Sequence, residues 1–453
     1  AVLPPGRKTE RMPKLLNDQA MWDFVVDGYT TVQADLDPEV HAGIHRDTAA
    51  VFRDKGNLGN GILAEVPALL DVFQHPNVTG ALSSILGAGY RAYPHRHCHL
   101  NQNGSDAQPM HLDSYEADEN NRHHRSRWAM AFYYCHDVDE GTGPTSVVPG
   151  GQYQTTQPAD EEVCFTGSAG SVCIVHYDSW HRATANLGDT PRYMHKWLFI
   201  RTEEPQRPSW DHAPGFTPDV ARPDVSRWDD PDSGRHADLW RSVWNWHCGL
   251  AGPNGGDGDA QALCEALRDT SETVRLNAGY ALARLGAPAV EPLIEALRDE
   301  AMRRLEANLG AGMTNPSYLS AGYALSALGA PAVPALQGEL GSRHWPVRAA
   351  AANILGDIGV HAEPAAGALS TCLTDGEPWV RRNAAEALGH IGAAAGAAAH
   401  TLGECLTDNV EWVRLNAAVA LTRLGPAATA AVPALMSALE DDAYYVRANA
   451  AHA

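Results

Sequence analysis

The sequence predicts a two-domain protein, with a β-rich N-terminal domain flanked by helices and a C-terminal α-solenoid. At 453 residues the chain is too long for one ordinary hydrophobic core. Near residue 250 its composition changes from short apolar runs, rich in tryptophan, histidine and proline, to long stretches of alanine and leucine. The glycine-rich octet 251–258 at this change is typical of a linker. We therefore assign residues 1–250 to the first domain, 251–258 to a linker and 259–453 to the second domain.

The N-terminal domain is predicted to be a double-stranded β-helix, the jelly-roll fold of cupin-like proteins. Residues 17–52 have the apolar spacing of helices, with a break at 27–30. Short strand-like runs follow at 93–100, 127–134, 145–148, 171–176 and 193–201. Many short strands separated by turn residues indicate a sandwich or a barrel. The double-sheet jelly roll is the version of these folds that commonly encloses a metal.

The C-terminal domain repeats one phrase, a Val-Arg pair followed by an alanine-rich amphipathic stretch that ends in glycine. Four copies start at intervals of 33 residues, at Val347, Val380, Val413 and Val446. An earlier copy starts at Val274, and an insertion of about ten residues near 298–315 displaces a further unit that lacks the Val-Arg pair. A turn and a second apolar helix complete each unit. A fixed period with two helices in each unit predicts an α-solenoid.

The repeated unit resembles a known class of helical repeats. Its order of acidic residue, Val-Arg pair, alanine-rich helix and Leu-Gly ending is similar to the short HEAT-like repeats of bilin lyase-type proteins. The resemblance covers residues 259–453 and implies a surface for docking or oligomerisation. A protein or a carrier protein is the class of partner that such a surface would bind.

The charge and the apolar content of the chain limit its partners. A formal net charge of −21 argues against nucleic acid, because phosphate binding needs a basic surface. No apolar run approaches the roughly 18–20 residues that cross a membrane. The eight cysteines have no CxxC spacing, which favours free thiols in a reducing compartment. We therefore expect a cytoplasmic protein with no nucleic-acid or membrane partner, and its oligomeric state stays open.

Three side chains of the N-terminal domain form a candidate iron site. His111 and Asp113 are two positions apart, so on a strand they point to the same face and can bind one ion. His181 follows a strongly β run and can supply the third ligand from another strand. Two imidazoles and one carboxylate suit iron(II) and leave open positions for a bidentate 2-oxo acid and dioxygen. Arg192, eleven residues past His181, is placed to bind the far carboxylate of the 2-oxo acid.

Two other histidine patterns compete with this assignment. A second His-x-Asp motif begins at His176 and would need His195 or His212 as its third ligand, with no arginine at a comparable spacing. Three further histidines alternate along one predicted strand face: His95, His97 and His99. We favour the first site, and we interpret the alternating histidines as pocket lining or exposed polar positions rather than a metal cluster.

Five motifs of the N-terminal domain follow one another in an order that matches a known family. They are Phe24–Tyr29, Gly143–Gly150, Gly170–Val172, His181–Asn186 and Pro191–Tyr193. Together they resemble the phytanoyl-CoA dioxygenase family of iron(II)/2-oxoglutarate oxygenases, over about residues 15–205. By position, the resemblance implies His111, Asp113 and His181 as iron ligands. It also implies that Arg192 pairs with the distal carboxylate of 2-oxoglutarate.

The resemblance leaves the second contact to 2-oxoglutarate open. Members of the family often carry a serine two residues after the distal histidine. Here Ala183 occupies that position and Thr184 follows it. Thr184 is therefore the candidate for this contact.

The activity implied by the resemblance is hydroxylation of an unactivated C–H bond with iron(II), 2-oxoglutarate and O2. Related halogenases lack the carboxylate ligand, so Asp113 favours hydroxylation or desaturation. We expect a small-molecule substrate, free or carrier-bound, such as a natural product. Two alternatives stay open: a protein side-chain hydroxylase that recruits its target through the repeats, and a non-catalytic HEAT scaffold.

Overall fold

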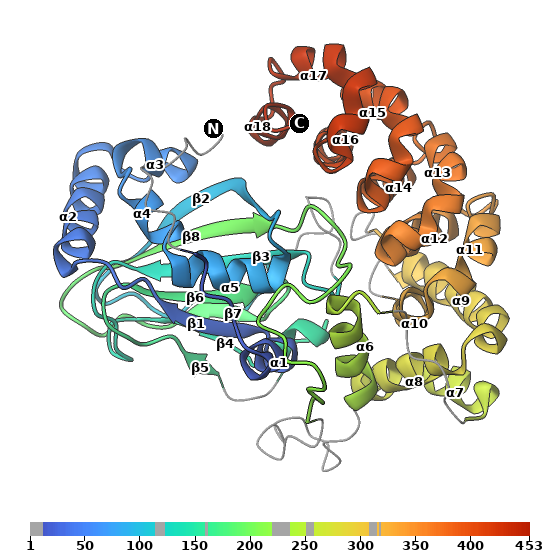
Figure 1. The fold of residues 1–453 in the computed structure, drawn as a ribbon, viewed down its shortest axis with the longest axis horizontal. Helices are drawn as coiled ribbons and strands as arrows, with labels where there is room; N and C mark the ends of the chain where they lie inside the picture. The colour runs from blue at the N-terminus through green and yellow to red at the C-terminus, as the bar shows by residue number, and fades with distance from the viewer. Residues whose placement is uncertain are drawn as a thin grey trace. The chain divides into compact units, whose positions relative to one another are not determined.

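The structure is a computed structural model that describes residues 12–113, 123–158, 162–219, 236–250, 258–307, 315–316 and 319–453, without the side chains of 304–307 (Figure 1). The described residues form two compact units. One unit contains residues 12–113 and 124–219, and the other contains His123 and the residues described from 236 onward. Most of the predicted linker, residues 251–257, lies outside the described residues.

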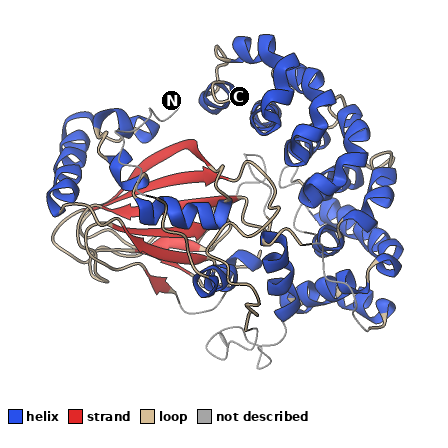
Figure 2. Cartoon of the chain, viewed as in Figure 1, coloured by secondary structure: helices blue, strands red, loops and turns tan. Residues whose placement is uncertain are grey.

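The first unit contains two antiparallel sheets, drawn in red in Figure 2. The larger sheet has the strand order β1-β6-β3-β8-β2, and the smaller sheet has the order β5-β4-β7. The strands are Tyr29–Gln33 (β1), Arg91–Asn101 (β2), Trp128–Tyr134 (β3), Thr145–Val147 (β4), Val163–Cys164 (β5), Ser171–His176 (β6), His181–Ala183 (β7) and Arg192–Ile200 (β8). Every residue of β3 and β8 is buried. Two antiparallel sheets in this arrangement confirm the predicted jelly-roll class.

Helices cover one face of the larger sheet (Figure 2). Among them, α5 packs against β3, β6 and β8. The helices of this unit are Asp18–Asp27 (α1), Pro38–Lys55 (α2), Ile62–Glu65 (α3), Leu69–Phe73 (α4) and Pro76–Leu86 (α5), with short 3₁₀ turns at Gly59–Gly61 (η1) and Gly151–Tyr153 (η2). On the opposite face, the ring of Phe132 in β3 lies 5.8 Å from the ring of His181 in the smaller sheet. The core between the sheets therefore reaches the predicted metal site.

The helical pattern is interrupted at 27–30, as predicted. Helix α1 ends at Gly28, whose φ of 80° lies in the left-handed region that glycine adopts without steric cost. The chain then continues as a strand, in which Tyr29 of β1 pairs with Val175 of β6. Local spacing locates the end of the helix, but the conformation of the next residues depends on a partner strand far away in the sequence.

The second unit is a helical repeat. Its helices are Ala237–His247 (α6), Ala260–Ala266 (α7), Glu272–Leu285 (α8), Val290–Ala307 (α9), Ser320–Leu328 (α10), Val333–Glu339 (α11), Trp345–Ile358 (α12), Ala366–Cys372 (α13), Pro378–Ile391 (α14), Ala399–Cys405 (α15), Glu411–Leu424 (α16), Val432–Ala438 (α17) and Tyr444–Ala450 (α18). Helix α6 belongs to this unit, where Asp238 accepts two hydrogen bonds from Arg284 of α8. The domain boundary predicted near residue 250 stays a prediction.

A ladder of ion pairs explains the repeated Val-Arg phrase. In three successive units, the arginine Nε lies 2.7 Å from the Oδ2 of an aspartate 27 residues further along: Arg348–Asp375, Arg381–Asp408 and Arg414–Asp441. Each arginine also donates from Nη1 to a backbone carbonyl six residues before it. Each aspartate lies in the turn before the next unit, so the ladder joins neighbouring units.

The second helices of the repeats locate the predicted insertion. Helix α9 has 18 residues, whereas α11, α13, α15 and α17 have seven each. The extra length falls in the predicted interval, and residues 308–314 lie outside the described residues.

One helical stretch is long and apolar enough to cross a membrane, judged by length and composition alone. Glu411–Ala438 has 28 residues and a mean hydropathy of 1.3, and half of its most apolar window is buried in the protein. It comprises α16, the 3₁₀ turn Gly425–Ala431 (η8) and α17, which together form one repeat. Packing between repeats accounts for such a stretch, because each helix pair buries its apolar face against its neighbours.

Candidate metal centre

His111, Asp113 and His181 meet at the end of the smaller sheet. His111 and His181 form an antiparallel bridge in which each backbone N–H donates to the other residue's carbonyl at 3.0 Å. One ligand atom from each of the three residues lies within 4.8 Å of the other two. Among the described residues, this is the one group of three potential metal ligands with such a geometry. The structure therefore brings together the three side chains that the motif spacing singled out.

Both histidines present Nε2 to the centre. Nδ1 of His111 lies 2.9 Å from the carbonyl of Pro109, and Nδ1 of His181 lies 3.0 Å from the carbonyl of Ser179. A carbonyl oxygen can only accept, so each Nδ1 carries the proton and each Nε2 keeps its lone pair. This tautomer, held by the backbone two residues earlier, is the form that binds a divalent metal.

Asp113 supplies a carboxylate next to both rings. Its Oδ2 lies 3.2 Å from Nε2 of His181, and its Oδ1 lies 3.9 Å from Nε2 of His111. The Lys196 ammonium forms an ion pair with the same Oδ2. Burial raises the pKa of Asp113, but the charge of the Lys196 ammonium beside it outweighs burial and holds the pKa well below its usual range. The carboxyl group is therefore ionised at neutral pH.

This donor set fits iron(II). Two neutral imidazole nitrogens and one carboxylate oxygen are the ligands of the facial triad that oxygen-activating iron sites use. The centre also attracts positive charge, because a buried ammonium already lies against Asp113.

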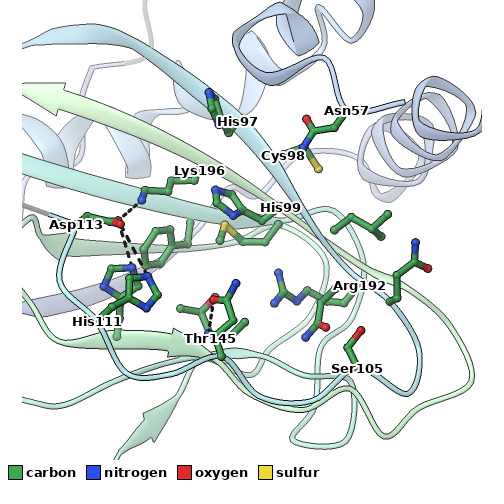
Figure 3. Close-up of a pocket in the computed structure, with 18 of the residues that line it drawn as sticks. Asn57, His97, Cys98, His99, Ser105, His111, Asp113, Thr145, Arg192 and Lys196 are labelled. Atoms are coloured by element: carbon green, nitrogen blue, oxygen red, sulfur yellow. Dashed lines mark hydrogen bonds and ion pairs between the residues drawn. The ribbon is translucent and has the colours of Figure 1, made fainter. Parts of the chain in front are cut away.

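The centre opens into a cavity of about 600 Å³, in which Arg192 lies apart from His111 and Asp113 (Figure 3). Arg192 begins β8 and is 1% exposed, and its Nε donates to the carbonyl of Gly143 at 2.9 Å. Its Nη1 is buried and has no hydrogen-bond partner among the described residues. Burial lowers the pKa of Arg192, yet a guanidinium stays charged in a protein. A buried guanidinium N–H without a hydrogen-bond partner is unfavourable, so Nη1 is suited to binding an anionic ligand.

Of the two threonines, Thr145 lines the cavity and Thr184 does not. Thr184 is absent from the lining, and its Oγ1 donates to the carbonyl of Pro144 at 2.9 Å. Thr145 begins β4 and lines the cavity, and its buried Oγ1 has no partner among the described residues. Ala183 also lines the cavity but offers no side-chain donor. The structure thus leaves Thr184 occupied elsewhere and supplies a different hydroxyl.

The competing His-x-Asp motif does not gather a third ligand among the described residues. His176 and Asp178 are buried, with Nδ1 and Oδ2 3.8 Å apart. Nε2 of His195 lies 3.2 Å from the hydroxyl of Thr48, and Nδ1 of His212 lies 2.6 Å from Asp18. Each of these candidate third ligands therefore has a partner of its own.

The alternating histidines of β2 belong to one wall. His97 and His99 line the cavity, while the rings of His95 and His97 stack at 4.3 Å. Burial, together with the charge of Lys196, lowers the pKa of His95 to about 3. Neutral imidazoles along the wall agree with the interpretation of pocket lining.

Sequence reasoning missed Lys196, Thr145 and Asn101, all of which line the cavity. Lys196 had a detectable signal, because it is four positions after Arg192 on a predicted strand and so shares its face. The side-chain amide of Asn101 donates to the carbonyls of Gly143 and Thr184, which holds the two segments next to Arg192 together. Nothing in the local sequence marks Thr145 or Asn101.

Three family descriptions match parts of the chain. Residues 24–194 match the phytanoyl-CoA dioxygenase (PhyH) family, residues 274–299 match the PBS lyase HEAT-like repeat, and residues 366–453 match HEAT repeats. No curated protein matches the chain. The matches confirm the predicted combination of a PhyH domain with C-terminal HEAT repeats. They also confirm the predicted enzyme class, an oxygenase that uses iron, 2-oxoglutarate and O2.

Several solved structures are similar to part of the chain. The non-heme alpha-ketoglutarate-dependent carbocyclase SnoK from nogalamycin biosynthesis is 18% identical, with a TM-score of 0.36, and the match covers 42% of this chain and 87% of SnoK. The epimerase SnoN, in complex with Fe3+, alpha ketoglutarate and nogalamycin RO, is 18% identical with a TM-score of 0.36, over 44% of this chain and 91% of SnoN. EctD from S. alaskensis, in its apoform, is 15% identical with a TM-score of 0.36, over 46% of this chain and 85% of EctD.

Proposed function

We propose that this chain, in which a PhyH domain is followed by HEAT repeats, hydroxylates an unactivated C–H bond of a small-molecule substrate, free or carrier-bound. One observation carries the proposal: His111, Asp113, His181 and Arg192 line one cavity, with three ligand atoms facing each other and a buried guanidinium nitrogen without a partner. The first three residues would hold the iron, and Arg192 would hold the distal carboxylate of 2-oxoglutarate.

Each residue has a separate task in this proposal. Iron bound at the centre would supply the activation of dioxygen, coupled to oxidation of 2-oxoglutarate. The backbone carbonyls of Pro109 and Ser179 keep both imidazoles in the metal-binding tautomer. Arg192, fixed through Nε by the carbonyl of Gly143, can offer Nη1 to a carboxylate in a charge-assisted hydrogen bond. The protein thus orients the reactants, while the cofactor performs the oxidation.

Asp113 bears on the outcome of the reaction. A carboxylate ligand occupies the position that a halide takes in related halogenases. We therefore propose hydroxylation or desaturation rather than halogenation.

Turnover of 2-oxoglutarate tests the proposal without knowledge of the substrate. Purified protein with iron(II) is expected to form succinate slowly from 2-oxoglutarate and O2, and His111→Ala or Asp113→Asn is expected to abolish this. Asp178→Asn, in the second His-x-Asp motif, is the matched control and is expected to keep turnover. Equal loss in the Asp113 and Asp178 variants, or unchanged turnover in both, would contradict the assignment.

For the HEAT repeats we propose a general role, without a specific partner. HEAT repeats generally mediate protein interactions, so we propose that this unit serves docking or oligomerisation in a cytoplasmic enzyme. Light scattering of the full chain checks the oligomeric part, because a self-association role requires a mass above that of one 48.6 kDa chain.

A further inference from the structure

Lys196 is a buried cation of the cavity that has no role in the proposed function. It lies in the middle of β8, is 6% exposed, and stands opposite His97 of β2 and Phe132 of β3. Its ammonium pairs with Asp113, and it forms no ion pair with any other described carboxylate. A charged side chain in such a position needs a partner at all times, because an unpaired buried ammonium is strongly unfavourable.

The ammonium binds one of the two carboxylate oxygens that Asp113 can offer to a metal. Asp113 Oδ2 is the carboxylate oxygen that faces Nε2 of His181 at 3.2 Å, and Lys196 pairs with this same oxygen. A divalent ion bound by Asp113 and His181 would lie within a few ångströms of an ammonium that stayed there. Two positive charges so close repel strongly in a buried site. Metal binding therefore displaces Lys196 from Oδ2.

The displaced ammonium has few alternatives among the described residues. His97 and His99 line the same wall beside Lys196 (Figure 3). A neutral imidazole can accept a hydrogen bond from the ammonium but supplies no negative charge. The other described carboxylate of the cavity is Asp106, which is exposed to solvent. A ligand that brings its own carboxylate next to the metal would satisfy the ammonium.

We propose that Lys196 exchanges partners: it pairs with Asp113 in the metal-free centre and with the metal-proximal carboxylate of 2-oxoglutarate in the loaded one. This inference rests on the proposed function. Its consequence is coupling between the two ligands. The metal must displace Lys196, which weakens metal binding, and 2-oxoglutarate relieves that cost by accepting the ammonium. Metal and 2-oxoglutarate therefore strengthen each other's binding, and by linkage the effect is reciprocal.

The first test measures binding of the metal alone. Mn(II) titration followed by electron paramagnetic resonance is expected to show about tenfold or greater tightening in Lys196→Met, because the competing charge is gone. Lys196→Gln gives the same direction through a second side chain, and thermal unfolding of both variants confirms that they fold. Lys196→Arg retains the charge and is expected to stay within about threefold of the unmodified protein. Unchanged or weaker Mn(II) binding in both neutral variants would overturn the proposal.

The second test measures the coupling. The Mn(II) dissociation constant is determined without and with saturating 2-oxoglutarate. The first value divided by the second measures the coupling, and it is expected to be at least fivefold larger in the unmodified protein than in Lys196→Met. Equal ratios would overturn the exchange of partners. Failure of the proposed function looks different. In that case the unmodified protein binds no Mn(II), and His111→Ala changes nothing.

Discussion

The repeat ladder and the metal cavity both contain buried or half-buried ion pairs, but they differ in what else those groups contact. In the ladder, Arg381 uses Nε on Asp408 and Nη1 on the carbonyl of Asp375, while Asp408 accepts the backbone N–H of Val410. In the cavity, Nη1 of Arg192 and Oγ1 of Thr145 are buried and have no partner among the described residues. The ladder pairs are satisfied within the protein and join neighbouring units, whereas the two unpartnered groups of the cavity lie where a ligand can reach them.

The largest effect is expected from Arg192→Leu. Removing a charge-assisted contact is expected to weaken binding of 2-oxoglutarate about 100-fold, since hydrogen bonds to charged groups contribute roughly 1.5–3 kcal/mol. The measurement is the dissociation constant of 2-oxoglutarate in the Mn(II)-loaded protein.

The matched control for Arg192 is a satisfied arginine beside the same centre. Arg182 follows His181 directly and donates to Glu162 from Nε at 2.9 Å and from Nη2 at 2.6 Å. Arg182→Leu is expected to change the affinity for 2-oxoglutarate by less than about threefold. Equal weakening in both variants would remove the distinction between satisfied and unsatisfied arginines.

In the ladder, substitution of an arginine is expected to lower stability and to leave activity unchanged. Arg381→Met leaves the Asp408 carboxylate without its ion-pair partner. The side chains of both residues are at most 13% exposed. The free energy of unfolding is expected to fall by about 1–3 kcal/mol while succinate formation is unchanged. Urea unfolding followed by circular dichroism measures the loss. Asp442→Ala is the control, because Asp442 is 92% exposed in its pair with Arg414 and such pairs contribute at most about 0.5 kcal/mol.

Glu300 in α9 differs from Asp375 and Asp441 of the ladder, because its pKa is raised rather than lowered. Burial raises its pKa to about 7, although the backbone N–H of Ala321 donates to it at 3.0 Å. Because this folded-state pKa exceeds the ordinary value of 4.5, the contribution of Glu300 to stability is complete below pH 4.5 and is lost as the pH rises through about 7.

Glu300→Gln keeps the acceptor for Ala321 and removes the titration. The free energy of unfolding is expected to rise by up to about 3 kcal/mol at pH 8 and to change little at pH 4.5. Unfolding curves at the two pH values measure the difference. A variant that is equally stable or less stable than the unmodified protein at pH 8 would show that Glu300 is satisfied like the ladder residues.

Much of the fold and part of the candidate site can be predicted from short-range patterns. The run 171–176 is β6 because its apolar residues suit a strand buried on both faces, and the glycine after each repeat helix ends it as expected. The i, i+2 spacing of His111 and Asp113 predicts a shared face, and both reach the centre although only His111 forms a β-bridge. These features need only local geometry.

The remaining features depend on register and orientation between distant segments. Whether Lys196 lies beside Asp113 depends on the pairing of β8 with β2 and β3, which no local pattern encodes. The choice between Thr145 and Thr184 depends on which side of the smaller sheet each hydroxyl faces, and the sequence offers two equivalent threonines. The role of each in binding 2-oxoglutarate therefore stays a prediction.

The smallest effect distinguishes these two hydroxyls. Thr145→Val removes the unpartnered hydroxyl and retains the side-chain shape and the backbone N–H bond to the Tyr134 hydroxyl at 2.9 Å. Loss of one hydrogen bond to a carboxylate is expected to weaken 2-oxoglutarate binding about tenfold, since a bond from a neutral hydroxyl to a charged group contributes roughly 1.5 kcal/mol. The hydroxyl of Thr184 donates to the carbonyl of Pro144. Thr184→Val is therefore expected to lower the free energy of unfolding by roughly 1 kcal/mol and to leave the affinity for 2-oxoglutarate unchanged. If Thr184→Val weakens 2-oxoglutarate and Thr145→Val does not, then an unsatisfied group does not mark the binding side of this cavity, and the rule drawn from Arg192 fails with it.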